Sequence, residues 1–366
     1  MEERKRILKL VEEGKLTAEE AIILLEKLEQ GPQATEPESE IVNDLSTHVN
    51  FEQEQEKTEQ TTYKQTSVKN KFVDFIDSAI KKIKDLDLDF NFGNAVEVSH
   101  IFQHSNVYLQ EIDLDVANGS IDIVPWDEND VRIECDAKVY KIENQHEARQ
   151  AFLKDVLFSI ENGKLRFLIQ KKQTKVKARI FIPRKHYEYI KIRMFNGPIS
   201  TNGLSVTDFR GKTANGSIKL REFNATNIEL EAVMGHIEVL DTTSKDCEIE
   251  TINGTVNVSG SYEKLDLQSF NGNIVSTLHD DKCHTLHVKT TAGNIDIYTP
   301  VTSSIEGELK SNLGGFLCEL PNMSVVEEKS EVVQKLLRFK TNQQVGKRCY
   351  IFADTKTGSV MIKPTN

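Results

Sequence analysis

The sequence predicts a mainly β protein whose body is a parallel β-solenoid, or β-helix, of coils about 20 residues long. Three observations predict it. An Asn-Gly type of turn recurs at nearly constant spacing, the residues on both sides alternate between apolar and polar, and the same residue types return at the same place in each repeat. We expect a helical insertion in this body and, before it, a small N-terminal helical hairpin on a disordered linker.

Glycine marks the repeat. The spacing is nearly constant from Gly197 through Gly293 to Gly314, and two longer gaps follow Gly119 and Gly314. A period of about 20 residues is typical of solenoids, in which each repeat stacks on its neighbours. The nine marker glycines are Gly119, Gly197, Gly216, Gly235, Gly254, Gly272, Gly293, Gly314 and Gly358.

Each marker lies between two predicted strands. The residue two positions after it is large and apolar in all nine repeats, and polar side chains such as Glu229 and Glu231 alternate with the apolar ones. This alternation predicts strands with one dry face. The apolar residues after the turn are Ile121, Ile199, Ile218, Ile237, Val256, Ile274, Ile295, Phe316 and Val360.

Asparagine often precedes the glycine, and a small hydroxyl residue often stands three positions before it. In a stack of coils each residue lies about 4.8 Å above its counterpart, so Asn and Thr side chains are expected to form ladders that bond vertically. An array of hairpins that forms a sandwich or a twisted sheet is the alternative. The solenoid and the hairpin array would place the same alternate residues inward on the two sides of Asn-Gly, so this pattern fits both folds. The predicted turn ladder comprises Asn118, Gly119, Asn196, Gly197, Asn215, Gly216, Asn253, Gly254, Asn271 and Gly272.

Residues 1–30 predict two short helices. Gly14 ends the first, and Thr17 and Glu20 have the spacing of a capping box at the start of the second. A unit this short cannot bury enough surface to be stable alone, so we expect it to dock on a protein partner or to self-associate. Its eight Glu against six Lys and Arg argue against a DNA-reading helix-turn-helix. The predicted docking residues are Leu8, Val11, Leu24, Leu25 and Leu28.

Residues 31–70 are rich in Gln, Glu, Thr and Ser, and this composition predicts a disordered linker. Residues 71–84 place Phe72, Ile76 and Ile83 at helical spacing with lysines on the opposite side, which predicts an amphipathic helix. We expect this helix to cap one end of the solenoid. Peripheral contact with an anionic membrane surface is the alternative.

The solenoid is assigned to residues 85–366, with a helical excursion near 144–160 (NQHEARQAFLKDVLFSI). We expect this excursion to lie over the flank of the stack. The irregular region after Pro321 is expected to cover the second end, because exposed sheet ends are sticky edges.

Composition limits the partners and the compartment. The 46 basic and 57 acidic residues give a net charge of −11, which disfavours binding to nucleic acid. The N-terminus lacks the apolar core of a secretory signal, and no apolar run is long enough to span a membrane. The five cysteines form no C-x-x-C pair and fit reduced, buried thiols. We therefore expect a cytoplasmic protein, peripheral to the inner face of the membrane if 71–84 binds lipid.

No catalytic motif stands out: the sequence has no P-loop, no G-x-S-x-G elbow, no H-E-x-x-H and no dinucleotide fingerprint. We predict no enzyme activity, no cofactor and no metal site. His236 is interpreted as a variant turn residue. The segment LHDDKCHTLHVK is interpreted as a polar turn leading into a strand, although its residue types could bind zinc: His279, Asp280, Asp281, Cys283, His284 and His287.

The motifs taken together resemble a known family. ILKLVEEGKLTAEEA is similar to the SHOCT-like helical module of bacterial envelope-stress proteins, and DLDLDFNFG, VANGSIDIVPW, ETINGTV and QSFNGNI are similar to the putative-adhesin β-strand-repeat family. Within that family the resemblance is to YvlB-like proteins of bacilli and, more distantly, to LiaX-like daptomycin-sensing proteins. It implies a role in the cell-envelope stress response with phage-shock-type membrane partners, and it supplies no catalytic residue.

Three hypotheses of function follow. The first is a non-enzymatic interaction protein, a rigid solenoid with a tethered docking hairpin, because a stack of repeats offers a long recognition surface. The second is a surface ligand sensor or adhesin that binds peptides or glycans along the solenoid. The third is a β-helix carbohydrate-active enzyme, which would need clustered carboxylates in a groove.

Overall fold

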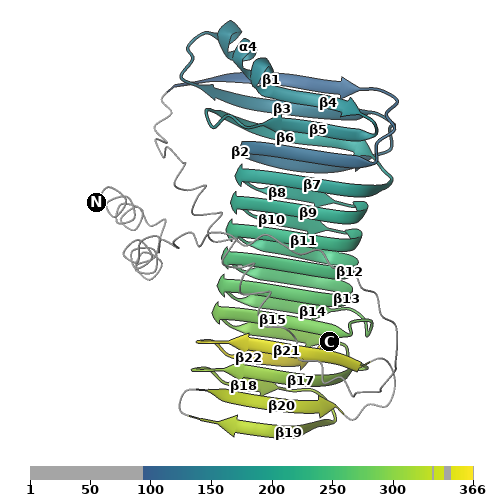
Figure 1. Cartoon of the computed structure of the whole chain (residues 1–366), viewed down its shortest axis with the longest axis vertical. Helices are drawn as coiled ribbons and strands as arrows, with labels where there is room; N and C mark the ends of the chain where they lie inside the picture. The colour runs from purple at the N-terminus through teal and green to yellow at the C-terminus, as the bar shows by residue number, and fades with distance from the viewer. Residues whose placement is uncertain (1–93, 332–333, 342–347, 366) are drawn as a thin grey trace, which may run out of the picture. The chain divides into compact units, whose positions relative to one another are not determined.

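The computed structural model describes residues 94–331, 334–341 and 348–365, and Figure 1 shows how their strands are arranged. These residues form a mainly β structure with one helix, α4 (Gln145–Asp155). The predicted hairpin 1–30, linker 31–70 and helix 71–84 lie outside the described residues, and so do the five predicted docking leucine and valine positions.

The strands that lead into the glycine turns form one stack, the entry sheet, and the strands that leave them form a second stack, the exit sheet. In spatial order, the entry sheet consists of β4 (Val156–Glu161), β5 (Lys164–Ile169), the first half of β2 (Glu111–Trp126), β7 (His186–Asn196), β9 (Ser205–Asn215), β11 (Asn224–Met234), the second halves of β12 (Ile237–Asn253) and β13 (Val256–Asn271), β15 (Thr285–Ala292), β21 (Arg348–Thr355), β17 (Ser304–Ser311), β20 (Lys335–Thr341) and β19 (Met323–Ser330).

The exit sheet consists, in spatial order, of β1 (Ala95–His104), β3 (Val131–Tyr140), β6 (Thr174–Pro183), the second half of β2, β8 (Ile199–Asn202), β10 (Ile218–Arg221), the first halves of β12 and β13, β14 (Ile274–Leu278), β16 (Ile295–Thr299), β22 (Val360–Pro364) and β18 (Phe316–Cys318).

The strands of neighbouring coils pair in parallel. The number of residues between two paired positions equals the spacing between the marker glycines of the two coils. Ile218 pairs with Ile199 on one side and with Ile237 on the other, and both offsets equal the spacing of the marker glycines there. The offset is shorter by one in the shorter repeat, as in the pair Ile249 and Leu267. Stacked parallel coils make a β-solenoid. The hairpin-array alternative is wrong for these repeats, because hairpins pair consecutive strands antiparallel.

The inward side chains of both sheets fill the space between them. Ile192 and Leu230 from the entry sheet and Leu220 from the exit sheet are fully buried. Burial of such an aliphatic side chain stabilises the fold by about 1.5–3 kcal/mol. The apolar residues two positions after the marker glycines stack into a column. This column is buried at Ile121, Ile199, Ile218, Ile237, Val256, Ile274, Ile295 and Val360, and Phe316 at the end of the exit sheet is partly buried.

Close backbone stacking explains the glycine at each turn. A Cβ on Gly216 would lie 2.0 Å from the carbonyl oxygen of Gly197, and a Cβ on Gly197 would lie 1.7 Å from that of Gly119. Neither distance is possible for non-bonded atoms, so a side chain at either position would push the coils apart. Gly197 also has a φ of +137°, which L side chains rarely adopt.

The hydroxyl residues do not bond to one another as the predicted ladder required. Each donates instead to a glycine carbonyl of the neighbouring coil: Thr290 Oγ1 to Gly272 O at 3.0 Å and Ser269 Oγ to Gly254 O at 3.1 Å. The carbonyl is the nearer acceptor because glycine lets the backbones approach. The vertical amide bond does occur between Asn196 and Asn118, where Nδ2 of the first donates to Oδ1 of the second at 2.9 Å.

The spatial order of coils differs from their order in the sequence at both ends. The coil of β2 stacks directly on β7 and β8, and the intervening β3 to β6 extend the sheets beyond β2. Near the other end, β21 and β22 lie between the coil of β15 and β16 and the coil of β17 and β18; these are the yellow strands between green ones in Figure 1. Successive units therefore do not always stack on one another.

Helix α4 covers one end of the two sheets, so its expected position over the flank is wrong. It packs against β1, β3 and β4, and β1 and β4 are the outermost described strands there (Figure 1). The reason is Phe152, which is fully buried in an aromatic cluster: the Phe102 ring centroid lies 6.5 Å from that of Phe152, 5.3 Å from Phe158 and 6.0 Å from Phe167. No helix in the described part of the chain is long and apolar enough to cross a membrane.

The region after Pro321, expected to be irregular, forms two strands at the opposite end. β19 and β20 pair antiparallel, and β20 pairs antiparallel with β17. These two strands were not predicted from the sequence, because their hairpin has neither the glycine turn nor the spacing of about 20 residues that the coils have.

Candidate interaction face

The outer face of the entry sheet carries charges that are sorted by sign. Because side chains alternate along a strand, the residues between the buried aliphatics point away from the core, and parallel register places them in rows. The basic band, on β7 and β9, comprises Lys191, Arg193, Arg210 and Lys212. The acidic band, on β11, β12 and β13, comprises Glu229, Glu231, Glu248, Glu250 and Asp266.

Ion pairs join the two bands where they meet. Arg210 Nε lies 3.3 Å and Lys212 Nζ lies 3.0 Å from the carboxylate of Glu229. Burial opposes ionisation of Glu229, but the hydrogen bond and charge of Lys212, together with Arg210, outweigh it and hold the pKa of Glu229 below its ordinary value. Burial likewise opposes the charge on Lys212, yet its contacts with Glu231 and Glu229 raise its pKa.

The far side of the basic band is neutralised in the same way. Arg193 Nη2 lies 3.0 Å from Asp115 and 3.9 Å from Asp113, both on β2. Arg193 is therefore paired on one side of the band, and Arg210 and Lys212 are paired on the other.

Carboxylates lie side by side at the centre of the acidic band. Glu248 lies in register between Glu229 and Asp266, so carboxylates adjoin it on both sides, and Glu250, only 6% exposed, adjoins Glu231. Like charges on adjacent strands repel one another, and a surface of one sign favours a partner of the opposite sign. Asp266, at the edge of the band, meets His287 Nδ1 at 3.0 Å.

An apolar row runs beside the acidic band, next to the turns. Val233, Ile252 and Phe270 occupy outward positions on the same three coils and are half-buried. Apolar side chains bordered by charged ones are typical of protein–protein contact surfaces.

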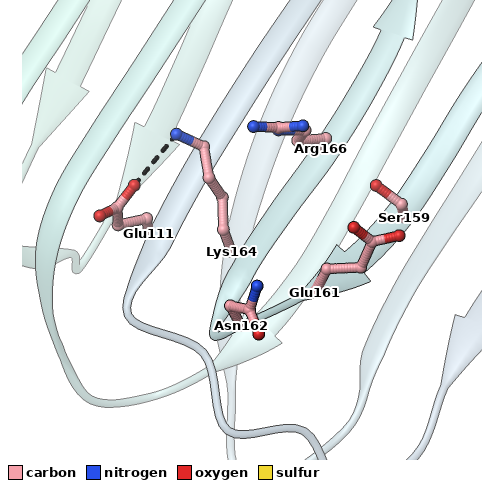
Figure 2. A pocket seen from close by; sticks show the side chains of 6 residues that line it. All are labelled: Glu111, Ser159, Glu161, Asn162, Lys164 and Arg166. Carbon is pink, nitrogen blue, oxygen red and sulfur yellow. Dashed lines mark ion pairs between the residues drawn. The ribbon is translucent and has the colours of Figure 1, made fainter.

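A surface hollow lies at the β4 and β5 end of the same sheet (Figure 2). Lys164 Nζ pairs with Glu111 at 3.0 Å in its lining, whereas Arg166 is exposed and has no ion-pair partner among the described residues. The hollow thus offers charges of both signs to a polar ligand. Its lining residues are Glu111, Ser159, Glu161, Asn162, Lys164 and Arg166.

The structure separates most of the potential zinc ligands of LHDDKCHTLHVK. Cys283 is buried, His284 is exposed and bonds to Thr285 Oγ1, and His287 faces Asp266. Over the ranges that the structure describes, no group of three or more His, Cys, Asp or Glu side chains could hold a metal ion. His236 Nδ1 lies 2.8 Å from Thr255 Oγ1 on the next coil and so links two turns.

The predicted turn-ladder residues gather along one edge of the stack. The basic band and the acidic band were not predicted from the sequence. The repeats were compared at their inward, apolar positions, whereas the charges are sorted at the outward positions. Aligning the repeats on glycine and reading the positions four and six before it would have found them: lysine and arginine in two repeats, then glutamate in the next two.

Comparison with known proteins decides the family. The Toastrack DUF4097 family model matches residues 109–343, and the protein YvlB of Bacillus subtilis (strain 168) is 46% identical over 362 residues, which cover 99% of this chain and 98% of YvlB. The chain belongs to the Toastrack DUF4097 family. This confirms the predicted resemblance, and a SHOCT-like domain model matches residues 2–33, where the helical hairpin was predicted.

Solved structures give weaker likenesses to this Toastrack chain. A putative cell adhesion protein from Clostridium sporogenes matches with a TM-score of 0.26 and 10% identity, over 74% of this chain and 100% of that one. A putative lipid binding protein from Parabacteroides distasonis matches with a TM-score of 0.34 and 12% identity, over 74% of this chain and 98% of that one. The family assignment rests on the sequence relationships.

Proposed function

We propose that this Toastrack protein is a non-enzymatic interaction scaffold of the bacterial cell-envelope stress response, acting in the cytoplasm or at the inner face of the membrane. The observation that supports it is the sorted charge on the entry sheet. Parallel register holds Glu229, Glu248 and Asp266 in one row, and the packed aliphatics beneath fix the backbone that carries them. A partner would therefore meet a rigid, preorganised surface.

The chemistry of this face indicates a partner protein with a basic surface. The carboxylates of the acidic band other than that of the buried Glu250 would attract its cations, and the apolar row Val233, Ile252 and Phe270 would bury its apolar side chains. In this proposal the SHOCT-like hairpin 1–30 is a second docking element, through Leu8, Val11, Leu24, Leu25 and Leu28, and two linked contacts bind more tightly than either alone.

Reversal of one charge at the centre of the band tests the proposal. We expect Glu248→Lys in the full-length chain to weaken co-purification of partners from envelope-stressed cells at least tenfold, while the thermal melt stays cooperative. The matched control is Glu263→Lys, the same change at an exposed residue of β13 outside the band. Equal recovery of partners by wild type and Glu248→Lys would reject this face as the contact surface.

The hollow of Figure 2 favours a second candidate function, binding of a polar ligand such as a peptide or glycan. Arg166→Ala would then abolish binding in a screen of peptides and acidic glycans, while Glu248→Lys would leave it unchanged. Fractionation of cells into cytosol, membrane and wall separates the candidates, because an adhesin must be found in the wall fraction.

A further inference from the structure

The C-terminal coil is inserted between two coils that precede it in the sequence, and a cysteine stands at the point of entry. β21 pairs in parallel with β15 on one side and with β17 on the other. Its second residue, Cys349, points inward and is 4% exposed.

A second buried thiol meets Cys349 there. Cys283, 2% exposed, ends the turn that leads into β15, and its thiol lies close enough to Cys349 to raise the pKa of Cys349. The backbone fixes this approach, since Tyr350 N donates to His284 O at 3.0 Å, one residue beyond each cysteine. Both sulfurs are present as free thiols.

We propose that Cys283 and Cys349 form a disulfide that locks the C-terminal coil into the stack. The oxidant is a low-molecular-weight disulfide. The thiolate of one cysteine attacks a sulfur of the oxidant and expels one small thiolate, leaving a mixed disulfide on the protein. The second cysteine, after losing its proton, attacks the protein sulfur of that bond and expels the other small thiolate. Two protons and two electrons pass from the cysteines to the oxidant, which becomes two thiols.

Access to the pair is through the turn that carries Cys283. Asp281, Lys282 and His284 in this turn are exposed and lie outside any strand. The neighbouring Cys283 thiol and burial raise the pKa of Cys349, so the closed pair reacts slowly and opening of the turn controls the rate. The lock therefore forms during sustained oxidation rather than in a brief pulse.

The test oxidises the full-length protein with glutathione disulfide, blocks the remaining thiols and maps the peptides by mass spectrometry. We expect a peptide pair joined through Cys283 and Cys349, loss of two free thiols per chain, and a rise in Tm that dithiothreitol reverses. Cys283→Ser and Cys349→Ser should each abolish the linked peptide and the rise in Tm. Cys318→Ser, a change at a more accessible thiol, should leave both intact.

Three results would overturn the proposal. These are free Cys283 and Cys349 after prolonged oxidation, glutathione adducts without the internal link, and a rise in Tm that Cys283→Ser retains. If a serine variant fails to fold, Cys283→Ala replaces it, because alanine adds no polar group to a buried site.

Discussion

Thr355 Oγ1 donates a hydrogen bond of 2.9 Å to the carbonyl oxygen of Gly293, although 62 residues separate them in the sequence. The same hydroxyl accepts a bond from Gly358 N at 3.2 Å, so one buried side chain ties its own turn to the turn of the next coil. Bonds of this kind recur along the stack at Thr213, Thr251, Ser269, Thr290 and Ser311. They explain why a small hydroxyl returns three residues before the glycine.

Thr355→Val should lower the free energy of unfolding by about 2 kcal/mol, because it removes both bonds while keeping the volume. Chemical denaturation measures the change. Thr357→Val, at an exposed position of the same turn, is the control and should change stability by less than about 0.5 kcal/mol. Equal effects of the two substitutions would show that the hydroxyl bonds do not stabilise the stack.

Gly216→Ala should destabilise the protein by about 3 kcal/mol or more, because the added Cβ would lie 2.0 Å from Gly197 O and force the two coils apart. The matched control is Gly315→Ala, where a Cβ would meet nothing within 4 Å. Thermal unfolding compares the two. A melt of Gly216→Ala that matches the control would mean that the turns can separate at little cost.

Ile274→Asp should unfold the middle of the stack, because it places an unpaired charge in a position that is 0% exposed. We expect a loss of about 4 kcal/mol or more, seen as a loss of the cooperative melt. Val275→Asp changes the next residue, which is half-buried and points outward, and should be tolerated. An unaltered melt of Ile274→Asp would contradict its place in the core.

The junction of the two bands should respond to acid. The pKa of Glu229 in the folded chain lies below its ordinary value of 4.5, so its ion pairs contribute fully above about pH 4.5 and are lost as the pH falls through the lowered value. Wild type should therefore lose stability more steeply below pH 4.5 than Glu229→Gln does. Tm measured between pH 7 and pH 3 checks this, with Glu263→Gln as the control that should follow wild type. If Tm falls equally with pH in wild type and in Glu229→Gln, the ion pairs of Glu229 do not contribute to the acid sensitivity of the protein.

Much of the solenoid could be predicted because each coil repeats the same short pattern of a glycine turn between two strands of alternating apolar and polar residues. The glycine spacing predicts the register, and the observed offsets between Ile199, Ile218 and Ile237 equal it. The buried column after each turn is predicted for the same reason. The family resemblance, carried by the N-terminal module and the turn motifs, is confirmed by the family models.

The position of α4 could not be predicted from its own pattern. Leu153 follows Phe152 directly and is also apolar, yet Leu153 is 37% exposed, whereas Phe152 is fully buried. The apolar space that receives Phe152 is formed by Phe102, Phe158 and Phe167, which come from three different strands. A helix placed by distant residues carries no local signal of where it lies.

The sequence by itself determined the coil: its length, its dry face, its glycine turn and the family to which the chain belongs. Only the tertiary structure decided which coils touch, and with that the insertion of β21 beside β15, the meeting of Cys283 and Cys349, and the rows that sort charge into bands. The physical reason is that every coil offers nearly the same edge to its neighbours. Hydrogen bonds between backbones make parallel stacking favourable without selecting which coil is next, and that choice depends on how side chains from distant parts of the chain fit together.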